Sequence, residues 1–140
     1  MAIEIGQVLS LKIKFNIKPG TISLCNHPYL VVGIDKIRNR IEVAQIDSLA
    51  GKEFKAARKT NKTIFCDGET VLDKDSYIQL DNKFTIENST KLEHFRRQPE
   101  KLTASKLADV LKAYNDYQNN FKIDSNKCVD MTISEILSWN

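Results

Sequence analysis

Apolar and polar residues alternate along residues 6–15 of the chain, in the stretch GQVLSLKIKF. One side of the alternation is large and apolar: Leu9, Leu11, Ile13 and Phe15. A period of two with one polar side is typical of a half-buried strand. The next segment, residues 16–27, contains the turn signal Pro19-Gly20 and is long for a hairpin connection, so we expect a long loop there.

Four later stretches also have the composition of strands, and turn residues separate them. They are residues 28–37 (PYLVVGIDKI), 41–49 (IEVAQIDSL), 62–67 (KTIFCD) and 76–87 (SYIQLDNKFTIE). The last stretch predicts one or two strands, because Asp81 and Asn82 interrupt it. Five or six short strands at this spacing predict an α+β, mainly β fold: a small antiparallel barrel followed by C-terminal helices.

Helical periodicity appears only in the last third of the chain. Four apolar residues follow the spacing i, i+3, i+4, i+7 of one helical face: Leu107, Val110, Leu111 and Tyr114. Thr103 is the expected N-cap of this helix. Near the end, Thr132 and Glu135 have the spacing of a capping box in front of a short final helix.

The chain length bounds the domain organisation. Its 140 residues suffice for one domain with a real core. We expect a barrel with its closing helix in residues 1–118 and a C-terminal extension, residues 119–140, packed on the same domain. The polar part of this extension, before the final helix, is expected to be a linker or an added strand.

Composition narrows the cellular setting. Hydrophobic residues make up 41% and charged residues 28% of the chain, as in ordinary soluble proteins. No apolar run is long enough to cross a membrane, and the N-terminus lacks the pattern of a secretory signal. The odd cysteine count (Cys25, Cys66, Cys128) favours reduced thiols. We therefore expect a cytoplasmic protein with no membrane partner.

Positive charge is concentrated in one segment. The net charge is +3, and residues 51–62 (GKEFKAARKTNK) hold five basic residues against a single glutamate. Such a segment is either a solvated, partly helical loop or a loop that contacts phosphate. Both interpretations stay open at this point.

The common catalytic signatures are missing from the sequence. It has no Gly-rich phosphate loop, no G-x-S-x-G, no His-x-x-x-His pair and no C-x-x-C. The cysteines and His27 follow no known zinc-finger spacing, and such thiols are more often small buried hydrophobes. We expect neither a metal ion nor a cofactor.

Taken in order, the predicted elements resemble the PemK/MazF family of toxins. The likeness covers residues 5–117. PYLVV (residues 28–32) is similar to the family's second strand, which begins Arg-Pro-x-Leu-Val-Val. Asp81 with FTIE (residues 84–87) is similar to its fifth strand, and LADVLKAY (residues 107–114) to its closing helix. The resemblance implies a barrel of the Src-homology-three kind.

The same resemblance implies an activity. Members of the family are homodimers that cleave single-stranded RNA without a metal ion, with the ribose 2′-hydroxyl as nucleophile. A cognate antitoxin protein blocks their RNA groove. The chain is thus expected to be a toxin-type endoribonuclease. The alternative is a nucleic-acid-binding or protein-binding module that keeps the fold and has lost the chemistry.

Three positions depart from the family's pattern, and His27 is the first. It stands where the family has arginine before the proline of the second strand. An imidazole changes charge near neutral pH, so His27 is the candidate acid or base of the reaction. A histidine that only packs or caps at the mouth of a strand is the alternative.

The other departures lie in the third and fifth strands. Asp47 and Ser48 replace a Thr-Ser pair: Ser48 is a candidate phosphate donor, and Asp47 would pair with His27 or repel phosphate. A turn-forming Asp-Ser is the alternative. Gln79 replaces an arginine and could bond a base edge. Asp81 matches the family and is a candidate orienting or second acid–base group, or else a hairpin aspartate.

Other cations must replace the missing arginines if the chain is a nuclease. The candidates are Lys14 and Lys18 beside the first loop, Lys55, Arg58 and Lys59 in the basic segment, and Arg96-Arg97. Arg58 and Lys59 are the first choice. Tyr29 and Phe54 are candidates for stacking on RNA bases, although a role in the core is the favoured interpretation for Tyr29.

Overall fold

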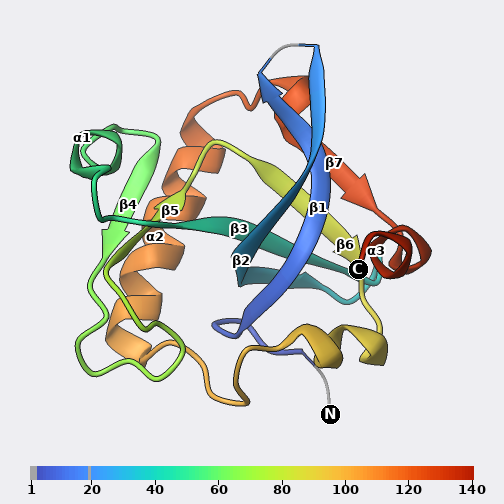
Figure 1. The fold of residues 1–140 in the computed structure, drawn as a ribbon, viewed down its shortest axis with the longest axis horizontal. Helices are drawn as coiled ribbons and strands as arrows, with labels where there is room; N and C mark the ends of the chain where they lie inside the picture. Colours follow the sequence, from blue (N-terminus) through green and yellow to red (C-terminus); the bar gives the residue numbers. More distant parts are fainter. Residues whose placement is uncertain (1–2, 19) are drawn as a thin grey trace.

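The chain folds into a mainly β structure with helices on its outside (Figure 1). The computed structural model describes residues 3–18 and 20–140. The strands are β1 (Val8–Lys18), β2 (Thr21–Asp35), β3 (Arg40–Ser48), β4 (Asn61–Ile64), β5 (Ser76–Gln79), β6 (Lys83–Glu87) and β7 (Cys128–Met131). The helices are α1 (Glu53–Ala56), α2 (Ala104–Asn120) and α3 (Ile133–Trp139), with 3-10 turns η1 (Thr90–Phe95) and η2 (Ser125–Lys127). The expected α+β, mainly β class is confirmed.

The first two strands form a long hairpin, so the loop expected over residues 16–27 is wrong. Leu11 lies opposite His27 in the pairing of β1 with β2, and His27 is inside a strand rather than on a loop. Gly20 turns the chain with a φ of +79°, a conformation that favours glycine; Pro19 lies outside the described residues. Ile22 and Leu24 alternate with polar neighbours but are exposed, so their pattern does not indicate a buried strand.

The third strand organises the sheet. Along one edge β3 pairs with β2. Along the other edge its first half pairs with β6 and its second half with β5. β4 extends the sheet beyond β5, and β7 joins β6 in parallel, while the other described pairings are antiparallel. The described residues therefore form one open sheet that forks at β3.

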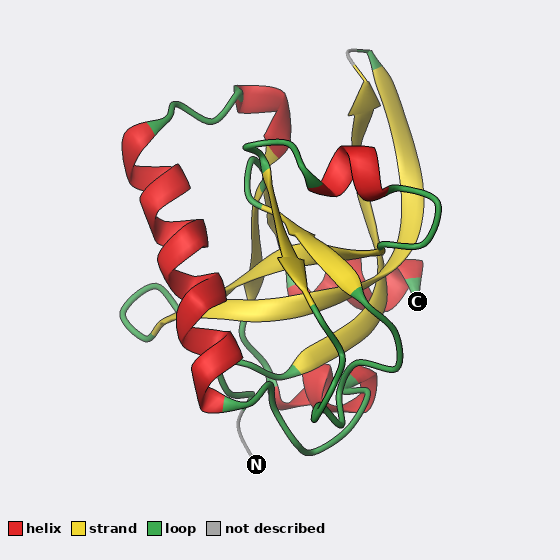
Figure 2. Ribbon diagram, turned by 90° about the vertical axis from the view of Figure 1, so that its left-hand side faces the viewer, coloured by secondary structure: helices red, strands yellow, loops and turns green. Residues whose placement is uncertain are grey.

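Each face of this sheet has a hydrophobic core. One core contains Leu9, Leu11, Ile13, Val43, Phe84 and Ile136, with α3 against it. The other contains Val8, Ala44, Ile46, Ile78 and Val110, with α2 against it. Alternate residues of β3 point to opposite faces, so this strand serves both cores. In Figures 1 and 2, α2 and α3 accordingly lie on different sides of the strands.

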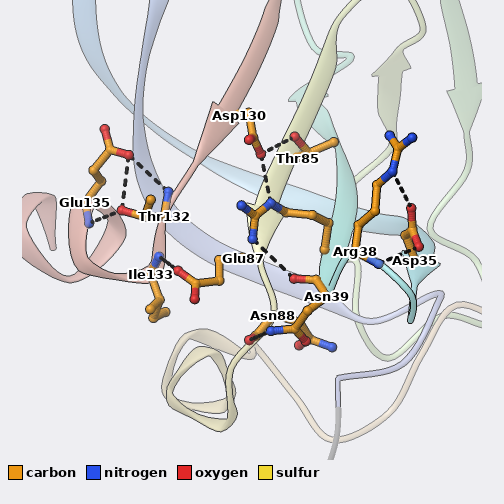
Figure 3. A network of polar contacts seen from close by, with 11 residues as sticks. Asp35, Arg38, Asn39, Thr85, Glu87, Asn88, Asp130, Thr132, Ile133 and Glu135 are labelled. Atoms are coloured by element: carbon orange, nitrogen blue, oxygen red, sulfur yellow. Dashed lines mark hydrogen bonds and ion pairs between the residues drawn. The ribbon is translucent and has the colours of Figure 1, made fainter.

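The C-terminal segment is joined to the sheet by β7 and α3. Thr85 donates a hydrogen bond of 2.7 Å to Asp130, and the backbone N–H of Ile133 donates to Glu87 (Figure 3). The expected capping box is confirmed, because the side chains of Thr132 and Glu135 bond to each other's backbone N–H. Met131 and Ile136 are buried in the core on this face. The polar stretch before α3 is thus in part an added strand.

The long helix α2 begins where expected, but its cap differs. Thr103 occupies the N-cap position and makes no side-chain cap bond. Its hydroxyl donates instead to Glu69, at 2.6 Å. The other oxygen of the same carboxylate accepts from the backbone N–H of Thr103. None of the helices among the described residues has the length and apolar character needed to cross a membrane.

Candidate functional site

Two adjoining cavities lie at the fork of the sheet, where β2 and β3 stop pairing. The histidine cavity, of about 260 Å³, is lined by Cys25, His27, Gln45, Asn82 and Lys127 among others. The basic cavity, of about 350 Å³, is lined by Asp47, Lys52, Lys55, Arg58 and Tyr77 among others. Gln79 and Asp81 line both cavities, so the two adjoin, and we call them together the groove.

Strand register brings His27 and Asp47 together. The last pair between β2 and β3 at this end is Tyr29 with Gln45, and two residues further along each strand are His27 and Asp47. Pairing ends next to Pro28, which has no backbone N–H to donate. The contact that the sequence suggested is present: His27 Nδ1 lies 3.2 Å from Asp47 Oδ1.

The His27–Asp47 contact fixes which ring nitrogen is available for chemistry. When Nδ1 donates its proton to the carboxylate, Nε2 carries the lone pair of the neutral ring. The His27 side chain is 32% exposed, whereas that of Asp47 is 9% exposed. The aspartate is therefore the buried member of the pair, and the histidine is the member that is open to the cavity.

Asp47 is held by several donors at once. Gln79 Nε2 donates to its Oδ2 at 2.8 Å, and Gln45 Nε2 donates to the same oxygen at 3.3 Å. Burial alone would raise the pKa of Asp47, but the hydrogen bond and charge of His27, with the two amides, outweigh it and lower the pKa to about 2. Asp47 is thus a carboxylate at neutral pH.

The two glutamines of this network differ in one respect. Gln79 uses both ends of its amide, since its Oε1 accepts from Asn82 Nδ2 at 2.6 Å. The expected contact of Gln79 with an RNA base would therefore need this network to open. Gln45 is buried, and its Oε1 has no partner among the described residues. A buried acceptor without a donor is costly, so this oxygen lowers the stability of the folded state.

Asp81 makes the second acid–base contact of the groove. Lys127 Nζ lies 2.7 Å from Asp81 Oδ2. The hydrogen bond with Asp81 raises the pKa of Lys127, against the effect of burial, so this side chain is an ammonium at neutral pH. Asp81 thus holds a cation, which is compatible with the orienting role suggested from the sequence, and its role as a second acid–base group stays a prediction.

The basic segment contributes one wall of the groove. Lys52, Lys55 and Arg58 line the basic cavity, whereas Lys59 is exposed and is not among its lining residues. Phe54 is exposed on α1, with Lys55 Nζ 6.0 Å and Arg58 Cζ 5.9 Å from its ring centroid. Of the two cations favoured from the sequence, only Arg58 reaches this wall.

Other predicted site residues lie apart from the groove. Ser48 follows Asp47 on β3 and so points to the opposite face, where it pairs in register with Ser76. Ser48 lines neither cavity of the groove. The side chain of Lys18 lies outside the described part of the chain. Tyr29 is buried, and its ring lies edge-on to that of His27, so it packs behind the site.

Several groove residues escaped the sequence analysis. Lys127 had no signal, because it lies beyond the resemblance and its partner Asp81 precedes it by 46 residues. Gln45 and Asn82 read as ordinary strand and turn residues. The place of Gln45 follows from the alternation of β3, which puts Gln45 and Asp47 on one face. Asn82 lies in the connection between β5 and β6 and donates to Gln79.

A cavity of about 530 Å³, larger than either cavity of the groove, lies elsewhere, beside β6 and β7. Its charged groups are largely paired with protein groups: Arg40 with Asp130 at 3.1 Å, and Glu42 with the Tyr114 hydroxyl. The groove at the fork combines a histidine paired with an aspartate and a wall of cationic side chains. We therefore take the groove as the candidate site.

The described residues include no group of three or more His, Cys, Asp and Glu side chains arranged to hold a metal ion. The three cysteines are free thiols. No family model matches this chain, and no curated protein matches it either.

Proposed function

We propose that this chain is an endoribonuclease that cleaves single-stranded RNA without a metal ion. The observation that carries the proposal is the His27–Asp47 pair at the junction of the two cavities, beside a wall of Lys52, Lys55 and Arg58. An oriented imidazole next to a cationic wall has the elements needed for phosphodiester chemistry: an acid–base group and charges that attract phosphate.

The proposed reaction is an internal transesterification. Nε2 of His27 takes the proton of the ribose 2′-hydroxyl, whose oxygen attacks phosphorus. The bond from phosphorus to the 5′-oxygen breaks, and that oxygen takes up a proton from solvent. Asp47 stabilises the imidazolium that forms on His27. The products are a 2′,3′-cyclic phosphate and a free 5′-hydroxyl.

We also propose that the chain is a toxin of the PemK/MazF kind, cytoplasmic, homodimeric and neutralised by an antitoxin protein. The resemblance of residues 5–117 supports this. The forked sheet, in which β3 pairs with both β5 and β6, supports assigning the fold to the barrel of the Src-homology-three kind. Growth arrest on expression, relieved by His27→Ala, tests the toxin assignment.

A binding module without chemistry is the second candidate function. It is favoured by the engagement of Asp81 with Lys127 and by the position of Ser48 outside the groove. Ser48, one of the three residues expected to be catalytic, therefore lies away from any phosphate bound in the groove. A binding module would retain RNA without cutting it.

Cleavage of a long, unstructured RNA by the purified protein in EDTA tests the proposal. We expect discrete fragments ending in 2′,3′-cyclic phosphate from the wild type, and none from His27→Ala. His94 is the matched control, because it is the chain's other histidine and lines neither cavity of the groove. Equal cleavage by the His27 and His94 variants would remove His27 from the mechanism. Bound but intact RNA would favour the binding module.

A further inference from the structure

Lys127 is the only lysine or arginine that lines the histidine cavity, within the described part of the chain. The other charged side chains there are Asp81 and, close by, Asp47, both acidic. Without Lys127, a phosphate entering this cavity would meet two carboxylates and, among the described residues, no lysine or arginine. The cations of α1 and its flanks line the neighbouring cavity instead.

The position of Lys127 is fixed by its partner. Asp81 Oδ2 lies 2.7 Å from Nζ, and the Lys127 side chain remains 39% exposed. An ammonium has three protons to donate. One is used by Asp81, and two are left for atoms that enter the cavity. A lysine is otherwise a flexible cation, so the carboxylate turns it into a directed donor.

We infer that Lys127, held by Asp81, forms a phosphate-binding subsite for the scissile phosphodiester of single-stranded RNA. This inference deepens the proposed function and rests on it. Lys127 donates to the non-bridging phosphate oxygens beside His27, where negative charge grows during attack on phosphorus. Asp81 is a positioning residue, which acts through the lysine.

Two measurements on the full-length protein test the subsite. The first is cleavage of single-stranded RNA, with kcat and KM determined for Lys127→Met, Lys127→Arg and Asp81→Asn. The second is binding to the same RNA carrying 2′-O-methyl riboses, which lacks the nucleophile, measured by anisotropy across a salt series. Lys112→Met is the matched control, since Lys112 also lies 2.7 Å from an aspartate, Asp116, but on the outside of α2.

We expect Lys127→Met to lower kcat/KM at least about tenfold, the loss of one charge-assisted hydrogen bond. Its salt slope for binding should fall by about 0.7, the value for one phosphate contact on a single strand. Lys127→Arg should keep most of both. Asp81→Asn keeps the Lys127 cation but removes the carboxylate that positions it. We therefore expect kcat to fall while KM does not rise. Lys112→Met should match the wild type.

Wild-type cleavage and salt slope in Lys127→Met would overturn the inference. Wild-type activity in a double Asp81→Asn, Lys127→Met variant would also overturn it, because the lysine would then only neutralise the aspartate. The same double variant replaces Lys127→Met if that protein fails to fold. A wild type that binds but does not cut, with a reduced slope in Lys127→Met, would refute the nuclease and keep the phosphate subsite.

Discussion

The groove contains two acid–base contacts that differ in how firmly the protein holds them. Asp47 is buried and accepts from His27, Gln45 and Gln79. Asp81 is more exposed and has Lys127 as its ion-pair partner, whose side chain is 39% exposed. The first contact is part of the folded interior, and the second lies at the surface of the groove. In the proposed nuclease, this difference separates a carboxylate that orients the histidine from a lysine that meets the RNA.

The two contacts also lie at different points of the fold. His27 and Asp47 come from neighbouring strands whose register continues into the contact. Lys127 and Asp81 come from η2 and the connection between β5 and β6. Substitutions, pH and salt should therefore change the free energy of unfolding unequally through the two contacts.

Deleting each carboxylate should give the largest difference. Asp47→Ala leaves buried amide donors of Gln45 and Gln79 without an acceptor and His27 without its partner, so we expect a loss of about 3 kcal/mol in the free energy of unfolding. Asp81→Ala should cost less than about 1 kcal/mol, because Lys127 turns to water. Urea unfolding measures both, and equal losses would contradict the comparison.

Acid should act on the first contact. The pKa of Asp47 is lowered to about 2. At pH values above the ordinary pKa of an aspartate, its carboxylate therefore stabilises the folded state. That contribution, about 2 kcal/mol, should disappear as the pH falls from about 4 through about 2. Urea unfolding across this range, with Asp47→Asn as control, measures it. A variant as acid-sensitive as the wild type would exclude Asp47 as the source.

Removing the Tyr29 hydroxyl tests whether the interior behind His27 contains no water. This hydroxyl is buried and has no hydrogen-bond partner among the described residues. Tyr29→Phe should therefore raise the free energy of unfolding, by about 1 kcal/mol. The control is Tyr114→Phe, which should lower it because the Tyr114 hydroxyl donates to Glu42. Thermal or urea unfolding measures both variants. If Tyr29→Phe is not stabilised, a water molecule bonds to the Tyr29 hydroxyl.

Salt should give the smallest effect. The Asp81–Lys127 pair is partly exposed, so about 0.5 M salt should remove most of its contribution of about 0.5 kcal/mol. The unfolding difference between wild type and Asp81→Asn should then vanish. The difference for Asp47→Asn should persist, because its donors are buried. A salt response in both variants would mean that Asp47 is more open to solvent than the structure shows.

Periodicity in the sequence was enough for the elements that bury one regular face. The alternation from Leu9 to Phe15 identified β1, and the spacing of Leu107 to Tyr114 identified α2. Periodicity failed for the first part of β2, where Ile22 and Leu24 face solvent although apolar residues are expected to face the core. The fork of the sheet was also hidden, since it depends on β3 having different partners along one edge.

The candidate site was predictable only where its residues lie close in the pattern of strands. His27 and Asp47 were suggested together, and their contact is present. Ser48 was expected beside them, but one residue along a strand reverses the face. Lys127 depends on the docking of η2 and β7 beside β6, a long-range arrangement without a local signal.

Lys127, the cation of the histidine cavity, lies near the end of the chain, and this sets an order of assembly during translation. A ribosome delivers the chain from its N-terminus, so His27 and Asp47 emerge well before Lys127. A nascent chain that has already paired β2 with β3 has the oriented imidazole but not the phosphate subsite. A chain whose translation stops before residue 127 is in the same state. Incomplete copies of the proposed nuclease would therefore spare the messenger RNA from which they are made.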